Sequence, residues 1–190
     1  MERLSDNYYV EKVRSGETGC FASLLERYSV QVFSLIVKMV GNREDAEELT
    51  QDVFVKAYGS LASFRGESSF STWIYRIAYN MAVSAVRKKK TVFIPVDEDR
   101  MENVPDEPEE AFSETAGPEV RLMNLNRALE RLSPEERAMI MLFYKDNKPM
   151  EEIAVIAGLT ESNVKTKIFR IRKKLWVWIK AMEEQQDEAG

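Results

Sequence analysis

The chain of 190 residues contains no histidine, and Cys20 is its only cysteine. One cysteine cannot form a disulfide within the chain, and without histidine the chain cannot build a Cys/His zinc site. The lack of an imidazole also excludes every catalytic scheme that uses histidine as the base. We therefore expect a protein of the reducing cytoplasm that holds neither a metal nor another cofactor.

Long hydrophobic runs are also absent. The most apolar stretch, residues 30–40, is interrupted by Gln31, Ser34 and Lys38, and it is much shorter than the roughly 20 residues that span a bilayer. The N-terminal residues are polar and lack the apolar centre of a signal peptide. The sequence therefore predicts neither a transmembrane segment nor a secretion signal.

The net charge of −5 is concentrated in one segment. Residues 1–90 carry 13 Lys/Arg and 11 Asp/Glu, and residues 121–190 carry the same numbers, whereas residues 91–120 carry one Arg and ten Asp/Glu. Local patches of charge, rather than the total, govern attraction to phosphate. The acidic total therefore does not exclude a nucleic-acid partner.

The acidic segment also holds four of the six prolines and shows no sustained helical or strand periodicity. We interpret residues 91–118 as a flexible acidic linker between an N-terminal domain, residues 1–90, and a C-terminal domain, residues 119–180. The polar residues 181–190 are expected to form a disordered tail.

Outside the linker, apolar residues recur at helical spacing and almost nothing alternates with a period of two. Leu25 belongs to the apolar stripe of the first long helix, which Gly41 ends, and Asn42 caps the next helix. Ser133 and Glu136 form a capping box. Helices are expected over about 21–40, 43–58, 71–89, 119–131, 134–144 and from 150 onward. The predicted fold is all-α, with an N-terminal helical bundle and a C-terminal helix-turn-helix.

Residues 150–175 have the pattern of a helix-turn-helix. Ala154 is the small residue needed where the helices cross, Gly158 tolerates a positive φ in the turn, Leu159 fills the corner and Thr160 can cap the second helix. One apolar stripe of that helix consists of Val164, Ile168, Ile171 and Leu175. Its other face carries Lys165, Thr166, Lys167, Arg170, Arg172, Lys173 and Lys174. Such a face can be merely solvated or can contact protein, but the whole pattern favours binding in the DNA major groove.

A second face suited to nucleic acid is expected between residues 71 and 89. Trp73, Arg76, Asn80, Ser84 and Arg87 share one side of that helix, and the preceding loop adds Phe64, Arg65 and Phe70. Aromatic rings stack on bases while cations follow the backbone of a single strand. Alternatively, Trp73 belongs to the core and the two phenylalanines anchor the loop.

The helix over 43–58 is acidic on its exposed side, at Asp45, Glu48, Gln51 and Asp52. Paired carboxylates can bind Mg²⁺ or act in acid-base chemistry, but no convergent base, nucleophile or phosphate-binding glycine loop accompanies them. A solvated face or a protein-docking face fits better, and we do not expect an enzyme.

The order of these segments resembles that of the extracytoplasmic-function (ECF) sigma factors of bacterial RNA polymerase. The resemblance covers roughly residues 18–178 and is carried by NREDAEELTQDVFVKAY, FRGESSFSTWIYRIAYN, the acidic linker, LSPEERAMIMLFY and the helix-turn-helix. It implies that the chain binds core RNA polymerase and directs it to promoter DNA, with residues 1–90 as sigma region 2 and residues 119–180 as region 4.

The resemblance also implies contact residues. The polymerase-clamp helix of the family matches DAEELTQDVF, so Glu48, Gln51 and Asp52 become candidates for contacting the clamp of the largest subunit. Candidates for reading and melting the minus-ten element are Arg65, Phe70, Thr72, Trp73, Arg76, Asn80, Arg87 and Lys88. Candidates for reading the minus-thirty-five element are Lys165, Thr166, Lys167, Phe169, Arg170, Arg172 and Lys173. The linker is similar to the family segment that threads the RNA path of the polymerase.

Further partners implied by the resemblance are the flap of the second-largest polymerase subunit and an anti-sigma factor, and no stable homo-oligomer is expected. Two departures concern the minus-thirty-five sequence. Family members commonly have arginine where this chain has Lys167, and glycine-threonine where it has Ser162 and Asn163. Lysine is the weaker partner for a bidentate contact with guanine.

Two rival functions remain open at this level. A free-standing repressor or activator would bind an operator without polymerase, but the sequence offers no evident dimer helix or ligand pocket. A nucleic-acid-processing enzyme would need a convergent catalytic cluster, with Glu48 or Asp52 as the acidic residues. Gel shifts without polymerase and assays of metal-dependent nuclease activity separate these two from a polymerase subunit.

Overall fold

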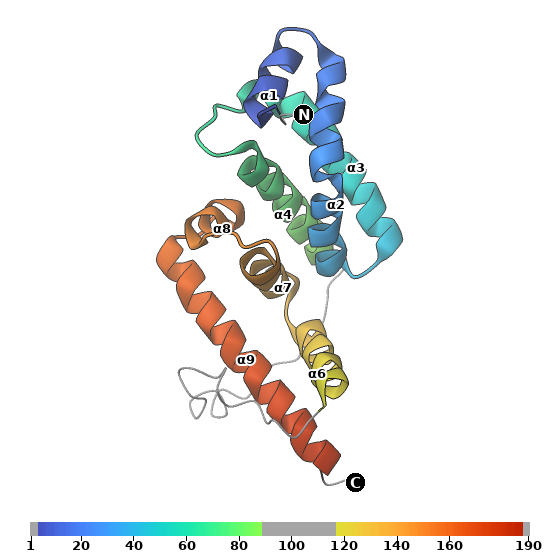
Figure 1. The fold of residues 1–190 in the computed structure, drawn as a ribbon, viewed down its shortest axis with the longest axis vertical. Coiled ribbons are helices and arrows are strands. Elements are labelled where there is room, and N and C mark those ends of the chain that lie inside the picture. The colour runs from blue at the N-terminus through green and yellow to red at the C-terminus, as the bar shows by residue number, and fades with distance from the viewer. Residues whose placement is uncertain (1–3, 89–116, 188–190) are drawn as a thin grey trace.

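The computed structural model describes residues 4–88 and 117–187, and all regular elements in these ranges are helical (Figure 1). The N-terminal domain comprises α1 (Asp6–Arg14), η1 (Thr18–Cys20), α2 (Phe21–Val40), α3 (Arg43–Ser60), η2 (Leu61–Ser63) and α4 (Phe70–Lys88). The C-terminal domain comprises α6 (Pro118–Arg131), α7 (Pro134–Ile140), the π-helical η4 (Met141–Lys145), α8 (Met150–Ala157) and α9 (Glu161–Asp187). The prediction of an all-α fold with two small helical domains is confirmed. The expected linker lies outside the described residues, apart from Gly117 and Pro118.

In the N-terminal domain, α2 packs against both α3 and α4. Gly41 adopts a φ of +75° and ends α2, and Asn42 accepts a hydrogen bond from the backbone N–H of Asp45 at 3.0 Å, which caps α3. The centre of the domain is formed by fully buried aliphatic side chains, among them Leu24, Val32, Leu35, Ile36 and Ile74. These local stop and start signals fix where the helices turn back on each other.

The stretch Thr18–Val40, which includes α2, is the one helix of the described residues that is long and apolar enough to cross a membrane. Its apolar side chains are already used within the protein, because Leu24, Val32, Leu35 and Ile36 face the core that α2 forms with α3 and α4. The stretch therefore fits the central helix of a folded domain.

In the C-terminal domain, the capping box of α7 forms as predicted, with Ser133 and Glu136 bonding to each other's backbone N–H. Gly158 ends α8 at a φ of +68°, and Thr160 accepts a hydrogen bond from Asn163 N at 3.2 Å. Ala154 is buried at the crossing of α8 and α9. The helix-turn-helix geometry therefore rests on the predicted residues.

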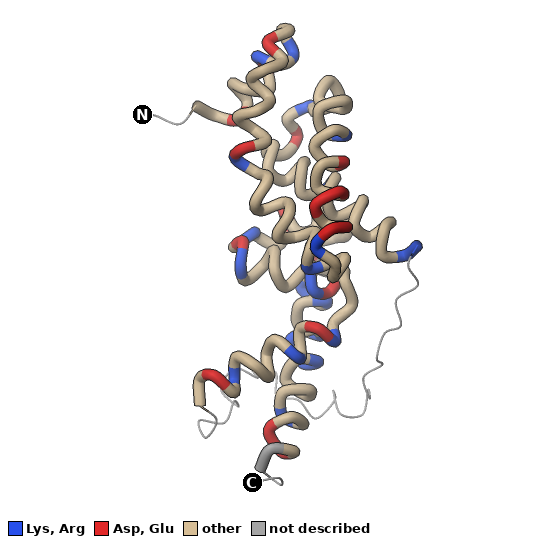
Figure 2. Tube along the Cα trace, turned by 90° about the vertical axis from the view of Figure 1, so that its right-hand side faces the viewer, with Lys and Arg blue, Asp and Glu red and all other residues tan. Residues whose placement is uncertain are grey.

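The two domains pack directly on each other. α8 and α7 both contact α4, and α7 also contacts α2, so the C-terminal domain lies across one end of the N-terminal bundle (Figure 1). One cluster of buried apolar side chains includes residues of both domains. Charges of both signs are spread along both domains (Figure 2).

Three features differ from the sequence-based expectation. α1 was not anticipated as a separate helix; it is short, and its N-cap is Ser5. Leu25 is 43 % exposed although it lies in the expected apolar stripe, because α2 is covered on only part of its circumference.

The disordered tail predicted for residues 181–190 is wrong for residues 181–187, which continue α9 to Asp187. Trp178, Ile179 and Met182 explain this extension, because they are buried in the half of α9 that accompanies α6.

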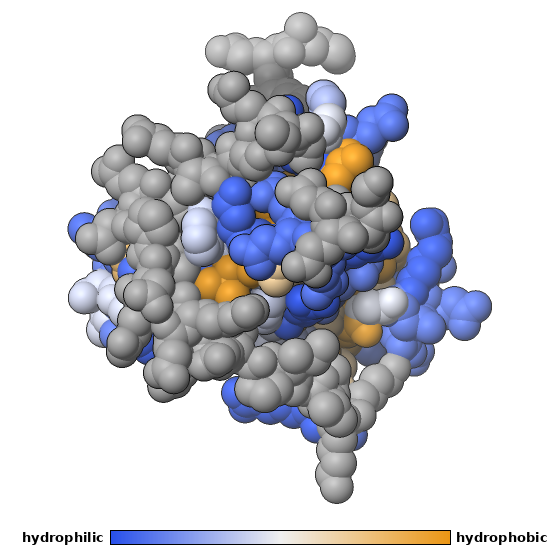
Figure 3. All heavy atoms as spheres, turned by 90° about the horizontal axis from the view of Figure 1, so that it is seen from below, coloured by the Kyte–Doolittle hydropathy of each residue, from blue (hydrophilic) through white to orange (hydrophobic). Residues whose placement is uncertain are grey.

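The end of the molecule where α9 finishes shows small apolar patches between hydrophilic side chains (Figure 3).

Candidate nucleic-acid interface

α9 presents the first candidate surface. Val164, Ile168 and Ile171 are buried against the domain, so the opposite side of the helix faces solvent. That side carries the exposed residues Lys165, Thr166, Lys167, Phe169 and Arg170. Arg172 and Lys173 follow at half-buried positions. The structure therefore brings all seven candidates for the minus-thirty-five element onto the first half of one helix.

Two contacts modify this surface. The ammonium of Lys173 lies 4.7 Å from the centre of the Phe169 ring, which orients both side chains. Lys174, which the sequence placed on the same basic face, forms an ion pair with Glu136 of α7 at 2.6 Å. Lys174 therefore holds α9 to α7, and the candidate DNA-binding surface ends before it, at Lys173.

The second candidate surface is an open groove between α3 and α4, with a volume of about 650 Å³. α4 contributes the half-buried Trp73, the exposed Arg76 and Asn80, and Lys88 at its end. α3 contributes Asp52 and Lys56 to the opposite wall. The acidic and the basic-aromatic faces were predicted as separate surfaces, whereas in the structure Asp52 of the acidic face lines the same groove as Trp73 and Arg76. Arg87 is exposed but does not line the groove, and Arg65 is exposed in the loop before α4.

The aromatic residues of this loop form a cluster. The rings of Phe64 and Phe70 lie 5.2 and 5.7 Å from that of Trp73, and Tyr28 of α2 lies 5.5 Å from Phe70. Phe70 is only 1 % exposed, so it is not the open stacking surface that the minus-ten assignment requires. Its burial favours the alternative role of loop anchor, and Trp73 keeps one side toward the groove.

Arg14 is a structural residue that sequence reasoning missed. Its guanidinium donates to the backbone carbonyl of Leu61 at 3.1 and 3.4 Å and also to that of Phe64, and it pairs with Glu11 at 2.9 Å. These bonds tie the end of α1 to the start of the loop that leads to α4. An arginine near a helix end carries no signal in the sequence for a contact about 50 residues away.

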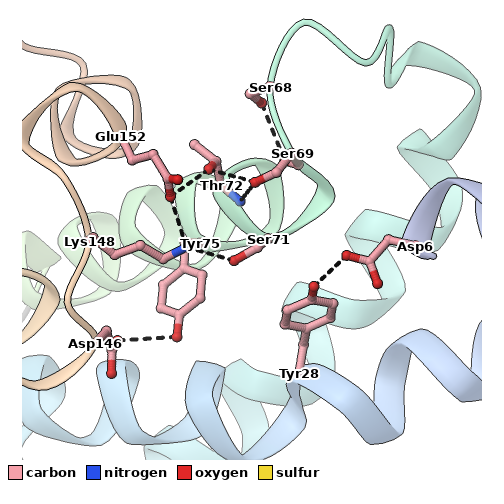
Figure 4. Close-up of polar contacts among 10 residues, drawn as sticks. All are labelled: Asp6, Tyr28, Ser68, Ser69, Ser71, Thr72, Tyr75, Asp146, Lys148 and Glu152. Carbon is pink, nitrogen blue, oxygen red and sulfur yellow. Dashed lines mark hydrogen bonds and ion pairs between the residues drawn. The ribbon is translucent and has the colours of Figure 1, made fainter. Parts of the chain in front are cut away.

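Thr72, a candidate for reading the minus-ten element, is only 2 % exposed. It lies on the first turn of α4, where Ser69 caps the helix by accepting from Thr72 N at 3.1 Å. The hydroxyl of Thr72 donates to the carboxylate of Glu152 in α8 at 3.0 Å (Figure 4). In this arrangement the C-terminal domain covers Thr72, which sequence reasoning could not foresee.

Two neighbouring contacts complete this junction (Figure 4). Lys148 donates to Ser71 at 2.9 Å and to Glu152 at 2.8 Å, and the hydroxyl of Tyr75 donates to Asp146 at 3.1 Å. Burial by itself would raise the pKa of Glu152, but hydrogen bonds from Lys148 and Thr72 outweigh it and leave this pKa below its ordinary value. The pKa of Tyr75 is raised, first by burial and then by the charge of Asp146. Glu152 is therefore a carboxylate and Tyr75 a neutral phenol near pH 7.

The acidic candidates lie together on α3. Glu48, Gln51 and Asp52 are all exposed on the side of α3 away from the core. Across residues 4–88 and 117–187, no group of three or more acidic, cysteine or histidine side chains is placed to hold a metal ion. The arrangement suits a contact with another protein, since its polar groups are presented outward.

Both domains match known families. The family model for Sigma-70 region 2 matches residues 24–92, and that for Sigma-70, region 4 matches residues 122–175. The chain is 34 % identical over 182 residues to the ECF RNA polymerase sigma-E factor of Escherichia coli (strain K12), covering 92 % of this chain and 94 % of that protein. It is 30 % identical over 182 residues to the ECF RNA polymerase sigma factor SigW of Bacillus subtilis (strain 168), covering 87 % and 92 %.

Two solved structures share the fold. CnrH in complex with the cytosolic domain of CnrY superposes with a TM-score of 0.66 at 23 % identity, covering 93 % of this chain and 97 % of that chain. The sigma factor RpoE in complex with the anti-sigma factor NepR from Bartonella quintana superposes with a TM-score of 0.61 at 21 % identity, covering 84 % of this chain and 96 % of that chain. Since the two domains, their order and their sequences agree with these relatives, the chain belongs to the ECF family of RNA polymerase sigma factors.

Proposed function

We propose that this ECF sigma factor acts in the cytoplasm as a promoter-specificity subunit with three contact surfaces, two of which meet at Asp52. α9 reads the minus-thirty-five element, the groove beside α4 reads and melts the minus-ten element, and α3 docks on the polymerase clamp. The observation that carries the proposal is the exposure of Lys165, Lys167 and Arg170 on one side of a helix whose other side is buried. A helix of this kind fits the major groove and is the reading element of a helix-turn-helix.

The groove beside α4 suits a strand that has left the duplex. The half-buried ring of Trp73 can stack on a base, while Arg76 and Lys88 follow the phosphates and Asn80 offers an amide for hydrogen bonding. Lys56 accompanies Asp52 on the opposite wall, so the net positive charge that attracts the phosphates comes from Arg76 and Lys88 of α4. Stacking on one aromatic side chain is worth about 1–3 kcal/mol per base, which favours an opened strand.

The remaining partners follow from the family. Glu48, Gln51 and Asp52 are assigned to the clamp of the largest polymerase subunit, and region 4 to the flap of the second-largest subunit. An anti-sigma factor is also expected, because RpoE of Bartonella quintana was solved with the anti-sigma factor NepR. The proposal assigns no catalytic step to the chain.

Replacement of Arg170 by alanine tests the role of α9. Holoenzyme reconstituted with core polymerase selects promoters from a DNA library with random upstream and downstream elements. We expect Arg170→Ala to lose discrimination at one or two upstream positions, by about tenfold for a lost bidentate contact, and to keep the downstream preference. Lys38→Ala removes a cation that is also exposed, from α2, and serves as the control. Unchanged upstream selection by Arg170→Ala would overturn the assignment.

A gel shift without polymerase addresses the rival regulator. A polymerase subunit gains its affinity by tethering two readers on one complex, so we expect only weak binding by the chain alone. Tight, sequence-specific binding of a short duplex by the chain alone would favour a free-standing repressor or activator.

A further inference from the structure

α1 is bonded to the start of the loop that precedes α4. The guanidinium of Arg14, at the C-terminal end of α1, donates to the backbone carbonyl of Leu61 at 3.1 and 3.4 Å and also to that of Phe64. Glu11, one turn earlier, accepts a further bond from it at 2.9 Å. Hydrogen bonds from a charged donor are stronger than those between neutral groups, and one planar guanidinium that binds two carbonyls fixes their relative position. α1 therefore sets where η2 ends and the loop begins.

α1 also supports the other end of this loop, through Tyr28 of α2. The hydroxyl of Tyr28 donates to the carboxylate of Asp6, in the first turn of α1 (Figure 4). Its ring lies 5.5 Å from that of Phe70, the first residue of α4, which in turn lies 5.7 Å from the ring of Trp73. Arg27 pairs with the same carboxylate and so helps to keep Asp6 in place. One short helix thus reaches both flanks of the loop.

The stretch between these flanks, residues 65–69, is named the reading loop below. Its residues are exposed, except for the half-buried Ser68. In the part of the chain that the structure describes, the hydrogen bonds of the reading loop stay local, within the loop or to Thr72 and Trp73 in the first turn of α4. The reading loop therefore has little packing of its own, and its position depends on how its flanks are held.

The selectivity of a loop that reads bases depends on this hold. A group that reads a base must be kept within about 0.5 Å of its place, and the residues around it supply that support. The guanidinium of Arg14 is already engaged by three groups of the protein, and its side chain is 32 % exposed, so it faces the protein. Arg14 therefore supports the loop that carries Arg65 without being a candidate for DNA contact itself.

We propose that Arg14 is a positioning residue for promoter reading, which fixes the start of the reading loop and thereby sets base selectivity at the minus-ten element without touching DNA. Asp6 has the same role at the other flank, where it acts through Tyr28 and Phe70. The proposal rests on the proposed assignment of the reading loop and α4 to the minus-ten element. It gives α1 a part in specificity that is exerted only through the loop.

Replacement of Arg14 by glutamine tests this role in holoenzyme reconstituted with core polymerase. The measured quantity is a discrimination ratio, the transcript yield from the preferred downstream element divided by the yield from an element with one base changed. We expect Arg14→Gln to lower this ratio by about fivefold or more at one or two downstream positions, the lower end of what one base contact supplies, and to leave the upstream preference unchanged. Glutamine stays polar but lacks the charge and the planar fork that joins two carbonyls.

The discrimination ratio separates positioning from a simple loss of folded protein. A destabilised chain forms fewer active holoenzymes, which lowers both transcript yields equally and leaves the ratio unchanged. A direct contact of Arg14 with phosphate would likewise affect all sequences alike. Arg14→Lys restores the cation without the planar fork, and we expect it to recover part of the ratio.

Lys12→Gln is the matched control, because it removes an exposed ion pair from the same helix. Tyr28→Phe keeps the ring beside Phe70 but loses the bond to Asp6, and we expect it to lower the same ratio by a smaller factor. An unchanged ratio in Arg14→Gln, or an equal fall in Lys12→Gln, would overturn the positioning role. If the unmodified holoenzyme has no downstream preference at all, the proposed minus-ten assignment itself is wrong, so the two failures are distinguishable.

Discussion

Gly158 shows how a single residue sets the reading helix in place. Its φ of +68° lies in the left-handed region, and no other atom would lie within 4 Å of a Cβ added there. The demand for glycine at this position therefore comes from the backbone conformation alone, not from crowding.

Gly158→Ala should lower the free energy of unfolding of the full chain by about 1 kcal/mol, since alanine pays the cost of a left-handed conformation. Gly19→Ala is the matched control, because Gly19 has equally open surroundings without a positive φ. Urea unfolding followed by circular dichroism measures both. Equal stability of the two variants would contradict this reading of the turn.

At the scale of the element, α1 acts on the loop before α4. Arg14 is the link, because its guanidinium donates to the carbonyl groups of Leu61, the first residue of η2, and of Phe64, which follows its last residue. Replacing Arg14 deprives these partly buried carbonyl oxygens of a charged hydrogen-bond donor. This loss lowers the free energy of unfolding more than the loss of a solvent-exposed ion pair does.

Arg14→Gln is therefore expected to lower stability by about 1–3 kcal/mol and to speed hydrogen exchange of the amides in residues 61–69. Lys12→Gln removes an ion pair that is exposed to solvent on the same helix, and we expect no measurable change from it. Exchange monitored by mass spectrometry compares the two variants. Unchanged protection of the loop in Arg14→Gln would contradict the role of Arg14.

The elements themselves were largely predictable from local signals. Gly41, Asn42, Ser133 and Gly158 act on their immediate neighbours, so the ends of α2, α3, α7 and α8 could be read from the sequence. α9 extends past the predicted end at residue 180, because the last turns of the helix are polar in sequence and give little sign that Met182 is buried. An apolar stripe that packs against another helix is a weaker sequence signal for the end of a helix than a capping residue is.

The contact surfaces were predictable in type but not in accessibility. The spacing of Lys165 and Arg170 along one helix is a local property, and the structure agrees with it. The burial of Thr72 depends on Glu152, which lies 80 residues later in the chain, and no periodicity encodes that meeting. The same holds for Asp52 and Trp73, which come from different helices and share one groove.

At the scale of the whole molecule, the central claim is that the chain gives core RNA polymerase its promoter specificity. The two domains meet through both polar and apolar contacts, and the acidic side of α3 and the basic side of α9 stay exposed. This arrangement is suited to a subunit that binds polymerase and reads two promoter elements.

Transcription in vitro with purified core polymerase and the intact chain tests this claim most directly. We predict promoter-specific transcripts that depend on the chain, and a loss of core binding and of transcripts when Gln51 and Asp52 are replaced by alanine, with Arg43→Ala, which removes an exposed ion pair of the same helix, as the control. The absence of promoter-specific transcripts with the unmodified chain, together with unchanged core binding by the double variant, would contradict it.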